Sequence, residues 1–367
     1  MNSTKQTWFP HVQWLRAFAA LSVLISHIIE LYPWKEFPIT GAWIWFHAGW
    51  MGVDFFFVIS GFVIMLAAQQ AMQHPPAAAR KQFMVRRVLR IYPLYMITII
   101  AFLCVVPEFF DAPHVGAHLI THIFLIHNLH PTTHGSLNGP NWSVAAEMQF
   151  YIVVCILMPW LVRIKILWLL GFGILCAILC RTILNAVVWY WGKSDFTHIL
   201  YSTQVPMMAD MFAYGMAVAL VVTRYPEMLQ GKARIGIISS ALMLATILLW
   251  CVLRIFWQES DFWGNPAMII FWRSFLGLGF ALVLVVAVWL PTKGTSSLLY
   301  KAGHYTGEIS YGIYLWHLPV ILLLKQYTWD SPLQFCIAVL VIVLGLSSLS
   351  WHLIEKLCIR YAKKKTA

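Results

Sequence analysis

Charged residues are scarce in this chain. Only 11% of its 367 residues are Asp, Glu, Lys or Arg, whereas 60% are hydrophobic and the mean hydropathy is +0.74. Soluble domains carry about 25% charged residues, so this chain lacks the polar side chains that would cover a soluble globule of its length. The composition excludes an ordinary soluble fold and indicates a membrane protein.

Other features are missing as well. None of the seven cysteines forms a Cys-x-x-Cys pair, and no disulfide framework is visible. The N-terminal stretch does not resemble a cleavable signal, because Lys5 is its only early basic residue and Arg16 interrupts the apolar region. The formal net charge is +11, but the basic residues lie in short segments between apolar runs. Membrane topology explains this charge better than nucleic acid does, so we expect no nucleic-acid partner.

Ten apolar runs are long enough to cross a bilayer, which requires about 20 residues of helix. The stretch 184–191 could extend the fifth run as an interfacial segment. We therefore predict an all-α bundle of about ten transmembrane helices that forms one domain over residues 1–367, with no appended soluble domain. The predicted runs are 12–32, 43–69, 91–107, 141–161, 165–183, 205–223, 235–256, 267–290, 308–325 and 333–355.

The basic residues predict the orientation of this bundle. The segment 108–140 contains no Lys or Arg, and Lys35 and Lys193 are the basic residues of the other loops on that side. The opposite loops are rich in basic residues, and this asymmetry is typical of cytoplasmic loops. It requires an even number of helices, with both termini in the cytoplasm. The basic residues of the predicted cytoplasmic loops and tail include Arg80, Lys81, Arg86, Arg163, Lys165, Arg224, Lys232, Arg234, Lys293, Lys301, Arg360 and Lys363.

Two ionisable residues lie in the first apolar run. Arg16 and His27 are eleven positions apart, about three helical turns or roughly 16 Å, so they project from similar sides of one helix. Ionisable groups at membrane depth are costly and indicate a functional site by default. The structural alternatives are a snorkelling Arg16 and a hydrogen-bonded packing role for His27.

Further ionisable groups fall within other runs. Glu147 lies about six residues into the fourth run, roughly 9 Å deep and at the predicted level of His27, so the two could form an oriented general base or a structural pair. Arg273 falls near the same level and could balance Glu147. Asp54 and Asp210 are surrounded by apolar residues and each need a partner. Tyr314 and His317 share a helical face, where a structural polar cluster is about as plausible as a substrate contact.

Arg87 and Arg90 lie in the predicted inside loop that ends at Tyr92-Pro93. Their i, i+3 spacing presents two guanidinium groups on one face, an arrangement that suits phosphate recognition. Ordinary cytoplasmic charge that binds anionic lipid is the alternative.

The segment 108–140 is rich in histidine. His114, His118 and His122 follow an i, i+4, i+8 spacing that would place metal ligands on one helix face. No acidic or cysteine ligand accompanies them, so we predict no metal site.

Five motifs resemble those of the acyltransferase-3 family of bacterial membrane acyltransferases, which includes O-antigen and exopolysaccharide O-acetylases. They occur in the family's order between residues 14 and 317. The first is a basic residue, a ten-residue gap and a histidine, Arg16 to His27. The others are Gly52-Val53-Asp54-Phe55-Phe56-Phe57-Val58-Ile59-Ser60-Gly61, Arg87-x-x-Arg90 before Tyr92-Pro93, Asn141-Trp142-Ser143-Val144-Ala145-Ala146-Glu147, and Ile309-Ser310-Tyr311-Gly312-Ile313-Tyr314-Leu315-Trp316-His317.

The resemblance implies roles for these residues. His27 is the expected catalytic base, with Arg16 in the same signature and Glu147 as a catalytic or substrate-positioning carboxylate. Arg87 and Arg90 are expected to contact the phosphates of acyl-CoA. Apart from the resemblance, we predict a substrate or structural polar cluster that comprises Asp54, Trp142, Arg273, Tyr314 and His317. Family members often end the last helix with Glu-Lys-Pro, whereas this chain has Glu355-Lys356-Leu357.

The expected function is transfer of an acyl group, most simply acetyl, from acyl-CoA to a hydroxyl of a cell-surface or lipid-linked carbohydrate. Acetyl-CoA would be a substrate, with no permanently bound cofactor, and the location would be the bacterial inner membrane. The first alternative is a secondary transporter that uses intramembrane carboxylates and histidine as a proton relay. The second is a membrane sensor or an assembly subunit. The acceptor, the acyl chain and the oligomeric state stay open.

Overall fold

The computed structural model describes residues 9–32, 34, 37–190, 200–262, 264–291 and 297–366, and in these ranges the secondary structure is entirely helical. Of the basic residues used above for orientation, Lys35, Lys193 and Lys293 fall outside the described ranges. The longer helices are α1 (His11–Leu31), α3 (Gly52–Ala71), α4 (Pro76–Val105), α6 (Trp142–Leu161), α7 (Ile166–Tyr190), α9 (Ala209–Arg224), α10 (Gly231–Gln258), α11 (Arg273–Trp289), α12 (Leu298–Glu308), α13 (Ser310–Leu324), α14 (Pro332–Ser350) and α15 (Lys356–Lys365).

Short helices fill the connections between them. Three of them precede α3 and four lie between α4 and α6, and the prediction of a loop over 108–140 misses the local order there. The short elements are η1 (Gly41–Trp43), α2 (Ile44–His47), η2 (Gly49–Met51), η3 (Pro107–Asp111), α5 (Val115–Ile123), η4 (His127–Leu129), η5 (Gly139–Asn141), η6 (Val205–Met208), η7 (Pro226–Leu229) and two π-helical turns, η8 (Met268–Trp272) and η9 (Trp351–Glu355).

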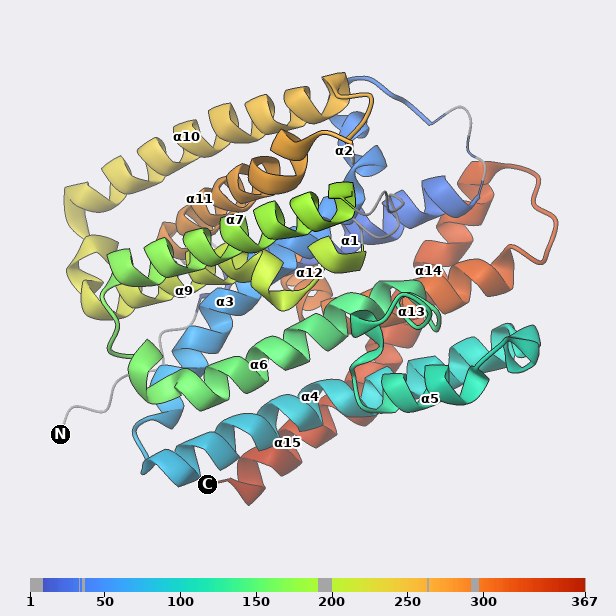
Figure 1. The fold of residues 1–367 in the computed structure, drawn as a ribbon, viewed down its shortest axis with the longest axis horizontal. Coiled ribbons are helices and arrows are strands. Elements are labelled where there is room, and N and C mark those ends of the chain that lie inside the picture. The colour runs from blue at the N-terminus through green and yellow to red at the C-terminus, as the bar shows by residue number, and fades with distance from the viewer. Residues whose placement is uncertain are drawn as a thin grey trace.

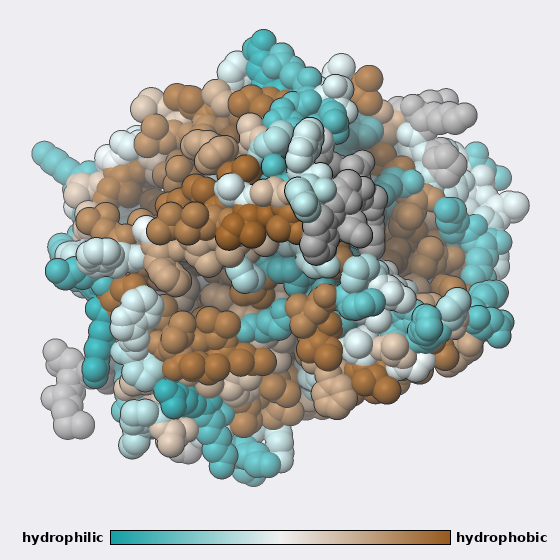
Figure 2. All heavy atoms as spheres, viewed as in Figure 1, coloured by the Kyte–Doolittle hydropathy of each residue, from teal (hydrophilic) through white to brown (hydrophobic). Residues whose placement is uncertain are grey.

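Nine helical segments of the described chain are long and apolar enough to cross a membrane. The pair α12 and α13 would make a tenth, but the two are bent by 68° at Ile309. Figure 1 shows the long helices running roughly side by side, and Figure 2 shows apolar side chains across the middle of the molecule with hydrophilic ones gathered toward its two ends. This banded surface fits a multi-pass membrane protein and confirms the predicted class, with nine or ten spans.

Several predicted boundaries are wrong. The run 91–107 belongs to a helix that already begins at Pro76, where a proline at the first helical position loses no intrahelical hydrogen bond. Arg87 and Arg90 therefore lie within α4 and not in a loop. The run 43–69 breaks at Ala48 into α2, η2 and α3. The extension of the fifth run to residue 190 is confirmed by α7.

Small residues let α3 approach its neighbours closely. A Cβ atom on Gly61 would lie 2.2 Å from the Phe212 carbonyl oxygen of α9, and one on Gly215 would lie 1.9 Å from the Val58 carbonyl oxygen of α3. Close backbone contact of this kind is the usual basis of helix association in a bilayer, where no hydrophobic effect drives it. The glycine of the Phe-rich motif thus fixes α3 in the centre of the bundle.

One end of the bundle carries α15, the α3–α4 connection and the α6–α7 connection, at the left of Figure 1. The helix α15 packs along the first turns of α4, where Gln82 Nε2 donates to the Thr366 carbonyl oxygen (2.9 Å) and Arg86 Nε donates to Thr366 Oγ1 (3.0 Å). Arg80, Arg163 and Arg224 belong to the same end, which we call the basic end. The helix α5 and the segment around it lie at the opposite end.

Candidate active site

A cavity lies in the bundle where α1, α3, α4, α6 and α13 meet. All five sequence motifs contribute lining residues. The motif on α1 contributes one, Arg16, and each of the other four contributes two or more. The lining residues are Arg16, Val53, Phe56, Phe57, Ile59, Ser60, Val63, Ile64, Arg87, Arg90, Ile91, Ser143, Val144, Glu147, Tyr151, Ser310, Tyr311 and Tyr314. Segments up to 300 residues apart in the chain therefore form one site.

Three guanidinium groups line the cavity. Arg87 lies over the rings of Phe83 and Tyr151, with its Cζ atom 5.7 and 5.9 Å from their centroids. Arg16 Nη1 donates to Gln13 Oε1 at 3.3 Å and interacts electrostatically with Arg90. No carboxylate of the described chain lies within ion-pair distance of these three groups. Planar guanidinium groups that are not neutralised in this way are suited to binding phosphate oxygens.

Glu147 supplies a carboxylate to the same cavity. Its Oε1 atom accepts from Ser60 Oγ at 2.6 Å and from the Tyr151 hydroxyl, which is one turn along α6. Its Oε2 atom makes no hydrogen bond within the described residues. The hydroxyl groups hold the carboxylate in place by one oxygen and leave the other available to a ligand.

A second carboxylate lies close to the arginines. Glu355 is 2% exposed and interacts electrostatically with Arg16 and Arg90. It is the last residue of the π-helical turn η9, and such turns change the direction of side chains, frequently at functional sites. Together with Glu147 it partly compensates the three guanidinium groups and leaves the region with a net positive charge.

Tyrosines of α13 form another part of the cavity wall. The Tyr314 hydroxyl donates to the Pro140 carbonyl oxygen at 2.8 Å and lies 2.7 Å from Ser143 Oγ. The Tyr311 hydroxyl donates to the Ile91 carbonyl oxygen at 2.8 Å. Both hydroxyls are engaged with the main chain or with Ser143, so these rings are fixed in position.

His27 lies one layer away from the cavity. Its ring centroid is 5.0 Å from that of His317, and the His317 ring is 5.6 Å from that of Tyr314, which lines the cavity. His27 Nδ1 lies 3.0 Å from the Val23 carbonyl oxygen, and because a carbonyl can only accept, Nδ1 carries the proton. The lone pair of Nε2 is then available, as a general base requires. No hydrogen bond of the described residues joins His27 to Glu147.

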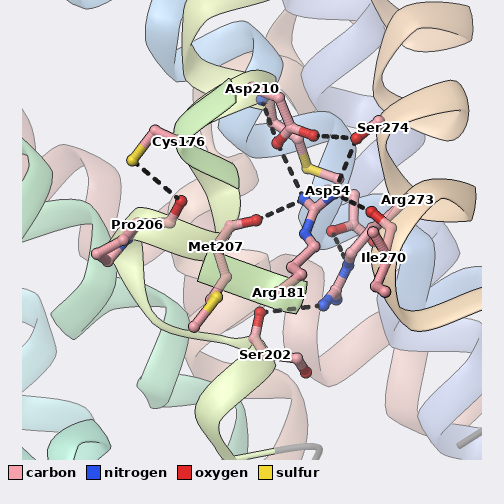
Figure 3. A network of polar contacts seen from close by, with 11 residues as sticks. Asp54, Cys176, Arg181, Ser202, Pro206, Met207, Asp210, Ile270, Arg273 and Ser274 are labelled. Carbon is pink, nitrogen blue, oxygen red and sulfur yellow. Dashed lines mark hydrogen bonds and ion pairs between the residues drawn. The ribbon is translucent and has the colours of Figure 1, made fainter. Parts of the chain in front are cut away.

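The other intramembrane charges form a separate cluster (Figure 3). Arg273 Nε donates to Asp54 Oδ1 at 2.9 Å, and Arg181 Nη2 pairs with Asp210 Oδ1 at 3.0 Å. Ser274, which follows Arg273 on α11, connects the two ion pairs. Its hydroxyl donates to Asp210 Oδ2 and accepts from Arg181 Nη1 at 2.8 Å. Arg273 thus neutralises Asp54, and the alternative that it balances Glu147 is wrong.

Backbone carbonyls complete this cluster. Arg181 donates to the carbonyl oxygens of Met207 and Ile270, and Arg273 Nη1 donates to that of Ser202 at 3.4 Å. Ile270 belongs to the π-helical turn η8, whose altered hydrogen-bond register fits the use of its carbonyl by a side chain. Each charge has an opposite partner, and all four side chains are at most about one-tenth exposed. The cluster is therefore a charge-balanced structural unit.

At the far end, histidine side chains pack together, and in the described part of the chain no group of three His, Cys, Asp or Glu is placed to hold a metal ion. The His122 and His127 rings stack with centroids 3.8 Å apart. Burial lowers the pKa of His122 to about 4, and burial together with His122 lowers the pKa of His127 to about 2. These neutral rings pack against Tyr95 and are part of the fold.

The structure thus brings together Arg16, Arg87, Arg90, Glu147 and Tyr314 around one cavity. Trp142 does not line the cavity, but its ring centroid lies 6.1 Å from that of Phe57, which does. Sequence reasoning missed the hydroxyls that hold Glu147, although Tyr151 is at the i+4 position from it and Ser60 belongs to the Phe-rich motif. It also missed Glu355 and the pairing of Arg181 with Asp210.

A bundle of apolar helices around a basic, carboxylate-bearing cavity defines a multi-pass membrane protein with a charged cavity between its helices. Residues 10–351 match the acyltransferase domain family, and the chain belongs to that family. The match covers nearly all of the described structure and confirms the resemblance that the five motifs indicate.

Curated relatives extend along the same region. The chain is 28% identical over 366 residues to a putative peptidoglycan O-acetyltransferase, YrhL, of Bacillus subtilis, covering 95% of this chain and 54% of that protein. It is 24% identical over 336 residues to the peptidoglycan O-acetyltransferase OatA of Listeria monocytogenes, covering 86% of this chain and 50% of that protein. The chain therefore spans about half the length of these relatives. No solved structure matches it.

Proposed function

We propose that this protein is a membrane O-acetyltransferase that moves an acetyl group from acetyl-CoA to a hydroxyl group of a cell-surface carbohydrate. The single observation that carries the proposal is the cavity in which three arginines and one carboxylate from three of the motifs meet inside an acyltransferase-family bundle. The names of the relatives from Bacillus and Listeria support a peptidoglycan-type acceptor.

The donor would enter from the basic end, which we place in the cytoplasm of a bacterial inner membrane on the positive-inside asymmetry. The CoA phosphates would bind Arg87 and Arg90, whose guanidinium groups are free of ion pairs in the described chain. The pantetheine arm is uncharged over most of its length and would lie along Val63, Ile64 and Phe56, the apolar part of the cavity. The thioester would thereby approach the wall formed by Tyr314.

The chemistry would take place between Tyr314 and His27. His27 Nε2 would accept the proton of the attacking hydroxyl, and the oxygen would add to the thioester carbonyl. Collapse of the tetrahedral intermediate would expel the CoA thiolate, which would take up that proton, so the net products are an ester and CoA. General base catalysis of this type contributes about 10²–10⁴-fold in rate.

Transfer of labelled acetyl groups tests the proposal. Purified protein in proteoliposomes, supplied with acetyl-labelled acetyl-CoA and an N-acetylglucosamine oligosaccharide, should produce a base-labile acetyl ester. The His27→Ala variant should lose at least a hundredfold in turnover, as expected for a lost general base. His130→Ala, which changes an exposed histidine, serves as a matched control and should keep wild-type turnover. Full activity of His27→Ala at equal protein levels would overturn the base assignment.

A further inference from the structure

The second histidine beside His27 has an incomplete set of hydrogen bonds. His317 on α13 is fully buried, and its Nδ1 atom donates to the Tyr314 carbonyl oxygen one turn earlier. Its Nε2 atom has no hydrogen-bond partner within the described residues. A buried acceptor left without a donor costs free energy and calls for an explanation, such as a catalytic role or a bound water.

The two imidazoles are arranged alike. Each has its Nδ1 proton on a main-chain oxygen of its own helix, Val23 for His27 and Tyr314 for His317. Each therefore presents Nε2 as an acceptor. With ring centroids 5.0 Å apart, the pair offers two acceptors and no donor between them. What would satisfy both is one water molecule that donates to each ring, or a single proton that the two rings share.

Few other groups act on this pair. His317 interacts electrostatically with His27, and Glu30, which is exposed on the last turn of α1, is the carboxylate that acts on His27. Asp54 is already neutralised by Arg273, and the Tyr314 hydroxyl is engaged with Pro140 and Ser143. Two neighbouring imidazoles in an apolar bundle cannot readily both be cations, because like charges oppose the second protonation. The pair can hold one proton in common.

We propose that His317 is a positioning residue for the reaction and that His27 and His317 act as a two-imidazole base. This inference rests on the proposed O-acetyl transfer. His27 Nε2 takes the proton from the acceptor hydroxyl, and the lone pair of His317 Nε2 stabilises the resulting imidazolium, directly or through one water. The proton then passes to the sulfur of the leaving CoA thiolate, so that both imidazoles are neutral again. His317 does not touch the thioester in this scheme and acts through His27.

Three variants of His317 separate this role from simple packing. His317→Leu fills the site with an apolar group and removes the unpaired acceptor, so it should fold at least as well as wild type. His317→Gln keeps a polar head without an imidazole. We expect both to lose tenfold or more in transfer turnover, with the KM for acetyl-CoA within twofold of wild type. In His317→Gly, imidazole added to the medium should restore part of the activity.

Histidine ¹⁵N NMR in detergent micelles tests the pair without relying on catalysis. In wild type, the His27 and His317 signals should respond to each other as one coupled titration, and His317→Leu should reduce this to a single-step titration of His27. His352→Leu, which changes an exposed histidine on η9, is the matched control and should alter neither the titration nor turnover.

The outcomes are distinct. Any one of three results would overturn the two-imidazole base. These are wild-type turnover in folded His317→Leu, wild-type turnover in His317→Gln, and a His27 titration that is the same in His317→Leu as in wild type. A coupled titration in a wild-type protein that transfers no acetyl group would support the pair and contradict the proposed function instead.

Discussion

Two groups of charges inside the bundle differ in one respect that decides their roles. Around the ion-pair cluster, two arginines face two aspartates, and each cation lies about 3 Å from an anion. Around the cavity, three arginines lie near Glu147 and Glu355, and none forms an ion pair in the described chain. Ionisable residues at membrane depth are therefore not functional by depth alone. Under the proposed function, the unbalanced group beside the cavity is the one that would receive the anionic donor.

The largest effect is expected for a variant that disrupts the ion-pair cluster of Asp54, Arg181, Asp210 and Arg273. Asp54→Leu would leave Arg273 buried without its partner and should destabilise the protein by about 3–5 kcal/mol. The double variant Asp54→Leu with Arg273→Met removes both charges and should recover most of that loss. Thermal unfolding midpoints in detergent measure all three proteins. If the double variant is no more stable than Asp54→Leu, the cluster is not a structural unit.

The same double variant tests whether the two groups of charges are independent, because it leaves Arg16, Arg87 and Arg90 of the cavity unchanged. Its affinity for acetyl-CoA should equal that of wild type. A loss of binding equal to that of an arginine variant of the cavity would mean that the two groups act together.

The next effect concerns Glu147, the anion of the cavity wall. Glu147→Gln removes one negative charge beside three guanidinium groups, so binding of the anionic donor should tighten, while turnover should fall by about 10²-fold if the carboxylate acts on the substrate. Kinetics with labelled acetyl-CoA separate the two effects. The matched variant Tyr151→Phe removes one hydrogen bond to the carboxylate and should change turnover by only a few-fold.

Tighter binding of acetyl-CoA to Glu147→Gln with unchanged turnover would reduce Glu147 to a charge that balances the arginines. That outcome would contradict a catalytic or positioning role for Glu147.

Much of this organisation could be predicted from the sequence. The apolar runs predict the spans because a bilayer demands about 20 apolar residues per helix, whatever the tertiary contacts are. The motifs predict that Arg16, Arg87, Arg90 and Glu147 belong together. The break between α12 and α13 could not be predicted, because Ile309 is an apolar residue that does not by itself indicate the end of a helix.

The partners of buried charges could not be predicted either. Asp54 and Arg273 are 219 residues apart, and their pairing depends on how α3 packs against α11. Depth counting placed Glu147 and Arg273 at one level, but the level of a residue does not determine which direction its side chain faces. The three-dimensional packing decided the pairing in favour of Asp54.

The smallest expected effect is the pH dependence of stability at the far end. The pKa of His122 is lowered to about 4 and that of His127 to about 2, so in the range from 6.5 down to 4 the unfolded chain binds protons that the folded protein does not. Stability should therefore be complete above pH 7 and fall as the pH drops below 6.5, by on the order of 1 kcal/mol per histidine at pH 5.5.

Unfolding midpoints across this pH range measure the effect. The double variant His122→Gln with His127→Gln should flatten the slope, while His130→Gln, at an exposed position, should not. An unchanged slope in the double variant would show that these rings are not the neutral, buried pair described here.

Direct binding of radiolabelled acetyl-CoA to the purified protein tests the central claim most directly. Wild type should bind in a salt-sensitive manner, since phosphate contacts made by arginine are charge-assisted. Arg87→Ala with Arg90→Ala should weaken binding at least tenfold, while the Asp54→Leu, Arg273→Met protein should bind as wild type does. Equal binding by the arginine variant and wild type would contradict the assignment of the cavity as the donor site.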